Sequence, residues 1–197
     1  IRGLKVKIYP VILCGGYGTR MWPLSRTNLP KQFIKIFDNK SLFQNSLEQV
    51  LDPKHFNKPY IMTNNEQKYL IKEQLKEAGV EQASVFLEPT SLSTAPAVTV
   101  AAMDIAKGDP NGVMLILSSD NEIKQRKEFA ELIYPAAQVA LEKNIYLLLS
   151  SKATYAETGY GYIKPGTLIA ENKKVTVSLI ERFVEKPPLA EAESCIK

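Results

Sequence analysis

Residues 10–33 read PVILCGGYGTRMWPLSRTNLPKQF, which combines a short apolar strand, a glycine turn and three spaced cations. Residues 11–14 are typical of a buried strand, and the glycines that follow it are Gly15, Gly16 and Gly18. Glycine lets backbone N–H groups approach anionic oxygens closely, so such a turn suits a phosphate. The cations that would neutralise a polyphosphate are Arg20, Arg26 and Lys31. The stretch therefore predicts a phosphate-binding loop after a first strand.

The spacing of these glycines differs from that of two other phosphate-binding motifs. A P-loop requires GxxxxGK followed by Ser or Thr, and no lysine follows these glycines at that distance. A dinucleotide-binding fingerprint requires GxGxxG, whereas Met21 stands where the third glycine would follow Gly16 and Gly18. The sequence thus disfavours both a P-loop NTPase and an NAD-dependent dehydrogenase.

Length and composition suit one globular domain. The chain has 197 residues, of which 45% are hydrophobic and 23% charged, and its net charge of +4 is too modest to indicate a nucleic-acid partner. No apolar run reaches the length of a membrane-spanning helix, so we expect no membrane partner. Two cysteines do not make a disulfide scaffold, which favours a cytoplasmic location. A single histidine leaves no plausible His-based triad.

Apolar runs and amphipathic segments alternate along the chain. The predicted strands are residues 11–14, 59–63, 84–87, 113–117 and 145–149, with a half-exposed strand at 175–184. The predicted helices are residues 41–51 behind a Ser41–Gln44 capping box, 65–78, 94–107 capped by Thr94, 128–143, and one beginning at Leu189. This alternation predicts an α/β fold, doubly wound and Rossmann-like, with a mainly parallel sheet.

Three polar motifs directly follow predicted strands: Gly15–Arg20, Glu88–Thr90 and Ser118–Asp120. Ligands of parallel sheets bind at the carboxyl ends of the strands, so we expect these motifs on one edge. Mg²⁺ prefers hard oxygen ligands, commonly one or two carboxylates plus substrate phosphates, which suits Asp120. The alternative for Asp120 is a cap on the following turn. For Glu88, recognition of a base and an ordinary loop carboxylate remain equally open.

Five segments resemble, in order and spacing, those of the sugar-nucleotide pyrophosphorylases, and within them the mannose-1-phosphate guanylyltransferase branch. The segments are GGYGTRMWPLSRTNLPKQF, LEPTSLSTAPA, SSDNEI, ETGYGYI and FVEKP. The resemblance runs from Tyr9 to about Pro187. It implies a nucleotidyltransferase fold and transfer of GMP from GTP to mannose 1-phosphate, which gives GDP-mannose and pyrophosphate with Mg²⁺ as the metal.

The same resemblance implies roles for residues that match the motifs. The implied catalytic residues are Arg20, Lys31 and Asp120, of which Asp120 also binds the metal. The implied nucleotide-binding residues are Cys14, Gly15, Gly16, Gly18, Thr19, Glu88, Thr94, Ala95 and Pro96. The implied sugar-phosphate-binding residues are Gly161, Glu185 and Lys186. Leu92, Ser93 and Asn121 stand where the family commonly has Arg, Asn and His.

The resemblance further implies one incomplete nucleotidyltransferase domain over residues 1–197, truncated at its C-terminus. Its nucleotide-binding part would cover about 9–150, and the beginning of a sugar-binding part about 151–197. A missing C-terminal region or a second chain is expected to complete it. Two alternatives remain: a non-catalytic or partner-dependent nucleotide-binding fragment, and a sugar-1-phosphate nucleotidyltransferase with another base or sugar preference.

Overall fold

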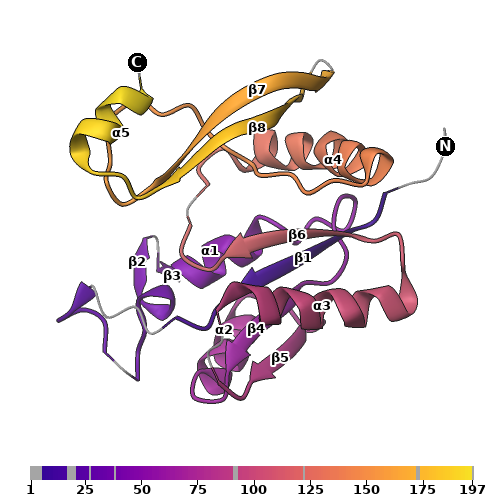
Figure 1. Cartoon of the computed structure of the whole chain (residues 1–197). Coiled ribbons are helices and arrows are strands. Elements are labelled where there is room, and N and C mark those ends of the chain that lie inside the picture. The colour runs from indigo at the N-terminus through magenta and orange to yellow at the C-terminus, as the bar shows by residue number, and fades with distance from the viewer. Residues whose placement is uncertain are drawn as a thin grey trace. The chain divides into compact units, whose positions relative to one another are not determined.

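The computed structural model describes residues 6–16, 21–26, 28–37, 39–90, 93–121, 123–171 and 174–196. The chain divides into two compact units, Ile1–Leu141 and Glu142–Lys197. A four-stranded sheet forms the centre of the first unit, and a two-stranded hairpin forms the sheet of the second (Figure 1).

All strands of the four-stranded sheet are parallel. They are β1 (Ile8–Leu13), β4 (Tyr60–Asn64), β5 (Ser84–Glu88) and β6 (Val113–Ser118), in the order β5-β4-β1-β6. The central strand β1 pairs through Ile12 with Ile61 of β4 and with Leu117 of β6. Ile12 is completely buried, as expected of a strand that is covered on both faces. The prediction of a doubly wound, mainly parallel sheet is confirmed.

Helices cover the two faces of this sheet. Residues of α1 (Leu42–Glu48), α2 (Lys68–Glu77) and α4 (Arg126–Lys143) share one apolar cluster with Ile12. Residues of α3 (Thr94–Gly108) share a second cluster with Val11. Because successive side chains of a strand point to opposite faces, α3 lies on the other side of the sheet from α1, α2 and α4.

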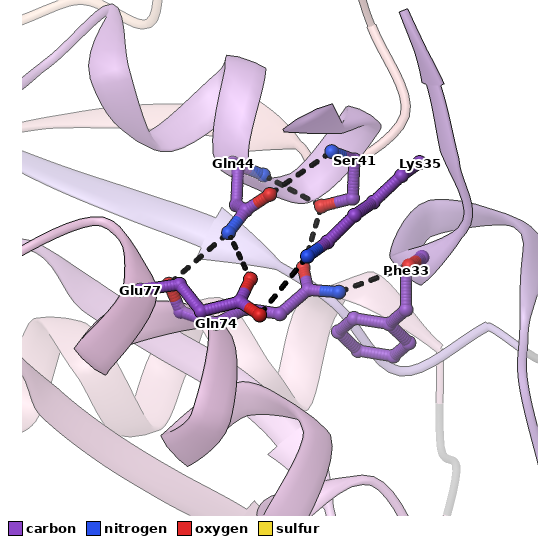
Figure 2. A network of polar contacts seen from close by, with 6 residues as sticks. All are labelled: Phe33, Lys35, Ser41, Gln44, Gln74 and Glu77. Atoms are coloured by element: carbon purple, nitrogen blue, oxygen red, sulfur yellow. Dashed lines mark hydrogen bonds and ion pairs between the residues drawn. The ribbon is translucent and has the colours of Figure 1, made fainter. Parts of the chain in front are cut away.

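A buried polar network fixes the segment between β1 and α1. This segment contains the 3₁₀ turn η2 (Lys31–Phe33) and two short strands, β2 (Lys35–Phe37) and β3 (Lys40–Ser41). The Ser41 hydroxyl donates to Gln74 Oε1 (2.5 Å), and Gln74 Nε2 donates to the Phe33 carbonyl (2.9 Å), as Figure 2 shows. Gln44 completes the predicted capping box with Ser41 and also donates to Glu77 (2.8 Å), which pairs with Lys35 (2.9 Å). Through these contacts α2 holds the turn that carries Lys31.

The second unit is a long antiparallel hairpin followed by a short helix. Its elements are β7 (Gly161–Glu171), β8 (Thr176–Glu185) and α5 (Leu189–Cys195). The register places Gly161 opposite Glu185. The predicted strand at 175–184 and the helix beginning at Leu189 are both confirmed.

The predicted strand at residues 145–149 is wrong, because the structure assigns no strand to these residues. Tyr146 is fully exposed and Leu148 is 60% exposed. Ile, Tyr and Leu fit a half-buried pleated surface, but a strand also needs a partner for its backbone N–H and C=O groups. No described strand pairs with this segment, and an apolar run does not reveal its partner.

The predicted cap of α3 is off by one residue. Ser93 precedes the helix as N-cap, with φ 74°, and Thr94 is already the first helical residue. The Ser93 side chain makes no capping hydrogen bond. Ser and Thr are both favoured at helix starts, so composition does not decide between neighbouring candidates.

Candidate functional site

The predicted polar motifs lie where parallel strands end. Gly15 and Gly16 follow β1, Glu88 is the last residue of β5, and Asp120 lies two residues beyond β6. Because the strands are parallel, these residues share one edge of the sheet. Gly18, Thr19 and Arg20, which were predicted to belong to this site, lie outside the described residues.

Lys31 and Asp120 meet at this edge. Lys31 Nζ lies 2.5 Å from Asp120 Oδ2, and the other carboxylate oxygen of Asp120 accepts a hydrogen bond from the Ser118 hydroxyl. Burial by itself raises the pKa of Asp120, but the Lys31 ammonium and the Ser118 hydroxyl outweigh burial and hold that pKa below its ordinary value. Asp120 is therefore an ionised carboxylate, next to a cation, at neutral pH.

Polar side chains hold the carbonyl groups of the glycine turn. Thr63 Oγ1 donates to the Cys14 carbonyl (3.0 Å), and Asn64 Nδ2 donates to the Gly15 carbonyl (3.4 Å). The Gly16 carbonyl accepts from two glutamines, Gln32 (2.7 Å) and Gln67 (3.2 Å). Within the described part of the chain, no acceptor is found for the amide N–H groups of Gly15 and Gly16. The turn thus has its acceptors satisfied and its donors available for an anion.

The residues that hold these carbonyls were not predicted from the sequence. Thr63 and Asn64 close the buried strand β4, so the strand-end argument applied to the other three strands would have found them. Gln32 directly follows Lys31 in the sequence and is 2% exposed. Buried glutamines have no comparable sequence signal, because their burial depends on the packing of α2 beneath the turn.

Ser46 of α1 is a further residue that the sequence did not reveal. Its hydroxyl, which is 1% exposed, lies 3.3 Å from the Ser118 carbonyl and 3.2 Å from the Asn121 carbonyl. A hydroxyl has one hydrogen to donate, so these two carbonyls share it. The contacts bracket Asp120 and tie its turn to a buried helix.

Glu88 lies close to the glycine turn. A Cβ built at Gly15 would lie 3.2 Å from Glu88 Oε2, so a glycine at this position leaves room for the carboxylate. Burial raises the pKa of Glu88 above its ordinary value. Thr94, Ala95 and Pro96 form the first turn of α3, which follows β5 in the chain. The structure thus brings Glu88 to Gly15.

Cys14 contributes its backbone to this edge. Its side chain is completely buried in the apolar cluster, and burial raises the pKa of the thiol to about 12. Such a thiol is neutral at physiological pH and is no nucleophile. The Cys14 side chain is therefore a core residue, and only its backbone is available to the predicted nucleotide site.

The predicted sugar-phosphate-binding residues come together in the second unit. A Cβ at Gly161 would lie 2.8 Å from Glu185 Oε2 and 2.9 Å from Cζ of Phe183, so the hairpin register brings the carboxylate against the glycine. Lys186 Nζ lies 3.0 Å from Glu185 Oε1, and both side chains are 57% exposed. The pair offers one anion and one cation to solvent.

The donor set suits a metal that takes part of its coordination from a substrate. Among the described residues, no group of three or more His, Cys, Asp or Glu is placed to hold a metal ion. A carboxylate has about four lone-pair positions, so Asp120 retains acceptor capacity beside Lys31 and Ser118. One carboxylate plus phosphate oxygens is a common environment of Mg²⁺. Asp120 therefore fits Mg²⁺ that is shared with a phosphate.

A doubly wound sheet with a glycine turn, a lysine and a carboxylate at the carboxyl ends of its strands places this chain in the class of α/β proteins that bind ligands at that edge. The family model described as Nucleotidyl transferase matches residues 9–197. The chain belongs to this nucleotidyl transferase family.

Similar proteins carry more specific names. The chain is 38% identical over 192 residues to an Escherichia coli protein named mannose-1-phosphate guanylyltransferase, covering 96% of this chain and 41% of that protein. It is also 38% identical to a protein of the same name from Sinorhizobium fredii, covering 97% and 36% of the two chains. A Thermus thermophilus structure described as a mannose-1-phosphate geranyltransferase superposes with TM-score 0.80 at 28% identity, covering 98% of this chain and 53% of that one. The chain thus spans about two fifths of the length of these curated relatives.

In the described part of the chain, no helix is both long and apolar enough to cross a membrane.

Proposed function

We propose that this chain supplies the nucleotide-binding part of an enzyme that transfers GMP from GTP to mannose 1-phosphate. The observation that carries the proposal is the Lys31–Asp120 pair beside a glycine turn in which side chains hold the carbonyls of Cys14, Gly15 and Gly16. The relatives named mannose-1-phosphate guanylyltransferase support the choice of GTP and mannose 1-phosphate.

The proposed reaction is a substitution at phosphorus. A phosphate oxygen of mannose 1-phosphate forms a bond to the α-phosphorus of GTP, and the bond from that phosphorus to the bridging oxygen of pyrophosphate breaks. Pyrophosphate leaves with the electron pair. A phosphate monoester with a second pKa near ~6 is mostly dianionic at neutral pH, so the nucleophile needs no protein base. The protein contributes positioning and neutralisation of charge.

Each predicted residue has a place in this proposal. The triphosphate would be surrounded by the amides of Gly15 and Gly16 together with Gly18, Thr19 and Arg20. Lys31 would leave Asp120 and bind a phosphate oxygen instead. Asp120 would hold Mg²⁺, which when bound neutralises charge on the phosphate oxygens. Glu88 and the first turn of α3 would contact the base. The mannose 1-phosphate contacts would come from Gly161, Glu185 and Lys186.

The two halves of the chain divide the substrates in this proposal. Residues of about 9–150 would bind the nucleotide, and residues of about 151–197 would begin the part that binds the sugar phosphate. We further propose a cytoplasmic location, because Cys14 and Cys195 are both free thiols. The proposed partners are these two small molecules, without nucleic acid or membrane.

Calorimetric titration of the 197-residue chain with GTP tests the nucleotide site. We expect binding that depends on Mg²⁺ and is tighter for GTP than for ATP, UTP or dTTP. Lys31→Ala should weaken it by about 1.5–3 kcal/mol, the range for a hydrogen bond to a charged group. Lys107→Ala, which removes an exposed lysine paired with Asp104 on α3, is the matched control and should bind normally. Equal GTP affinity in Lys31→Ala and the control would contradict the triphosphate assignment.

A nucleotide-binding fragment that needs further residues for catalysis is the second candidate. It is favoured by the length of the relatives, since the chain covers only 41% of the Escherichia coli protein. Chromatographic assay of GDP-mannose formed from GTP and mannose 1-phosphate separates the two candidates. GTP binding without GDP-mannose indicates the fragment. Tighter binding of ATP, UTP or dTTP than of GTP would indicate another base preference, and indistinguishable affinities for the four nucleotides would mean that the base site is not functional.

A further inference from the structure

A cavity of about 570 Å³ lies in the first unit between residues 22–26 and 28–30 on one side and the beginning of α2 on the other. Its volume is within the range of small-molecule sites, which is roughly 300–1,000 Å³. The residues that define its chemistry are Trp22, Ser25, Arg26, Glu66, Gln67 and Leu70. Lys31, Asp120 and Glu88 are not part of its wall.

Two opposite charges, Arg26 and Glu66, line this cavity. Within the described part of the chain, neither the Arg26 guanidinium nor the Glu66 carboxylate takes part in an ion pair or a hydrogen bond through its side chain. A guanidinium binds phosphate oxygens through paired N–H donors, and a carboxylate only accepts hydrogen bonds. The cavity therefore offers an anion-binding group and a separate acceptor for N–H or O–H groups.

The rest of the cavity wall includes the flat indole of Trp22 and the polar hydroxyl of Ser25. Trp22 is 77% exposed, which is unusual for the largest apolar side chain. Ser25 is 2% exposed, and its hydroxyl has no hydrogen-bond partner among the described residues. Indole surfaces stack well on planar rings, and an unpaired buried hydroxyl is costly until it gains a partner.

The cavity is separate from the base contacts of the proposed function. It adjoins α2, which packs on the face of the sheet opposite to α3, whereas Thr94–Pro96 begin α3. It also adjoins the glycine turn, because its wall residue Gln67 donates to the Gly16 carbonyl (3.2 Å). A ligand in this cavity would therefore contact a residue that holds the turn.

We infer that the cavity binds a guanosine phosphate as a second nucleotide site. The indole of Trp22 stacks on the base, Arg26 binds the phosphate, and Glu66 accepts from the base. Guanine presents two adjacent donors, a ring N–H and an amino group, to one carboxylate. Adenine and uracil present only one donor on the corresponding edge, so the carboxylate selects guanine. Binding here is independent of whether the chain catalyses the proposed transfer.

Fluorescence of Trp22 provides the experiment, because it is the only tryptophan of the chain. Titration with GMP should quench this emission saturably, and AMP, UMP, mannose 1-phosphate and inorganic phosphate should quench it less. Arg26→Ala and Glu66→Gln should each weaken GMP binding roughly tenfold or more, as expected from the loss of a charge-assisted hydrogen bond. Both side chains are exposed, so these variants should fold. Glu73→Gln, an exposed carboxylate on α2 that does not line the cavity, is the matched control.

Substitutions of Lys31 and Asp120 distinguish binding in the cavity from binding at the proposed triphosphate site. Lys31→Ala and Asp120→Asn should leave the GMP quench unchanged, even if they abolish GTP binding or turnover. Loss of the quench in these variants would mean that the cavity belongs to the triphosphate site and would overturn the inference. Equal quenching by inorganic phosphate, or unchanged GMP binding in both Arg26→Ala and Glu66→Gln, would overturn it as well.

Discussion

The Lys31 ammonium lies 2.5 Å from Asp120 Oδ2, joining the turn before β2 to the end of β6. The two side chains are 31% and 29% exposed, so the pair is neither sealed in the core nor fully in water. A phosphate and its metal ion would compete for these two groups: the phosphate for Lys31, the cation for Asp120. Their pairing holds both side chains in place at this edge of the sheet and keeps Asp120 ionised.

Removing Lys31 should raise the pKa of Asp120. In the wild type the lowered pKa means that Asp120 stabilises the fold above its unfolded pKa of about 3.9, and that this stability is lost as the pH falls through the folded pKa. In Lys31→Ala, burial opposes ionisation with less compensation, so the carboxylate should protonate at higher pH. Carbon NMR of the Asp120 carboxyl measures this pKa. Lys107→Ala, which removes an exposed lysine on α3, serves as the control, and an unchanged Asp120 pKa in Lys31→Ala would refute the coupling.

Ser46→Ala should loosen the turn that carries Asp120. Loss of the shared hydrogen bond to the Ser118 and Asn121 carbonyls should lower the free energy of unfolding by about 0.5–1.5 kcal/mol. If Ser46 positions Asp120, the Mg²⁺ dependence of GTP binding should also shift to higher Mg²⁺ concentration.

A variant with a similar loss on the other face of the sheet controls for stability. Tyr60→Phe removes the hydrogen bond from Tyr60 to Asp104 (3.3 Å), far from Ser46 in the packing of the sheet. Both variants should be measured by denaturant unfolding and by GTP titration at several Mg²⁺ concentrations. If Ser46→Ala and Tyr60→Phe change the Mg²⁺ dependence equally, Ser46 has only a structural role.

Glu88→Gln should leave the fold intact and improve its stability at neutral pH. The pKa of Glu88 is raised by burial, so its ionised form is disfavoured in the folded state. Below the unfolded pKa of about 4.3 both states hold the proton, and the variant should match the wild type. As the pH rises through the folded pKa, the wild type loses stability that the glutamine variant keeps. Thermal unfolding of both proteins between pH 4 and 7 checks this. The stability of the variant minus that of the wild type should increase from pH 4 to pH 7, and a decrease would contradict the prediction.

The sequence predicted most of the first unit because its signals are local. The apolar runs of β1, β4, β5 and β6 match the observed strands within a few residues, and the Ser41–Gln44 capping box was readable from four letters. Parallel strands then place their carboxyl ends on one edge, which brought Gly15, Glu88 and Asp120 together without knowledge of side-chain contacts. The run at 145–149 failed because pairing is not local: its residues favour a strand, but the described structure gives it no partner.

The parts of the site that escaped prediction depend on packing between distant segments. Gln67 and Ser46 are buried polar residues on or beside helices, and nothing in their neighbouring residues shows that they hold Gly16 and the Asp120 turn. The Lys31–Asp120 pair needs the fold of residues 31–41, which the Ser41–Gln74 and Gln74–Phe33 hydrogen bonds fix against α2 (Figure 2). The sequence motifs identified Lys31 and Asp120 as site residues, whereas the contact between them is known only from the structure.

Gly161→Ala should displace the Glu185 carboxylate while leaving the stability of the second unit nearly unchanged. The added Cβ would lie 2.8 Å from Glu185 Oε2 and 2.9 Å from Phe183 Cζ, closer than real Cβ contacts, so both must move. Both side chains are exposed and can shift, and the free energy of unfolding should change by only about 0.5 kcal/mol. Carbon NMR of the Glu185 carboxyl should report its displacement.

If Glu185 meets the sugar phosphate, Gly161→Ala should also weaken binding of mannose 1-phosphate in a calorimetric titration. Gly159→Ala is the matched control, because a Cβ there makes only an ordinary contact of 3.4 Å with Glu157 Oε1. The control should keep both the Glu185 signal and the wild-type response to mannose 1-phosphate. An unmoved Glu185 signal in Gly161→Ala would contradict the close approach across the hairpin. A moved signal with an unchanged response to the sugar phosphate would instead remove Glu185 from the proposed sugar site, since the contact would then serve only the pairing of β7 with β8.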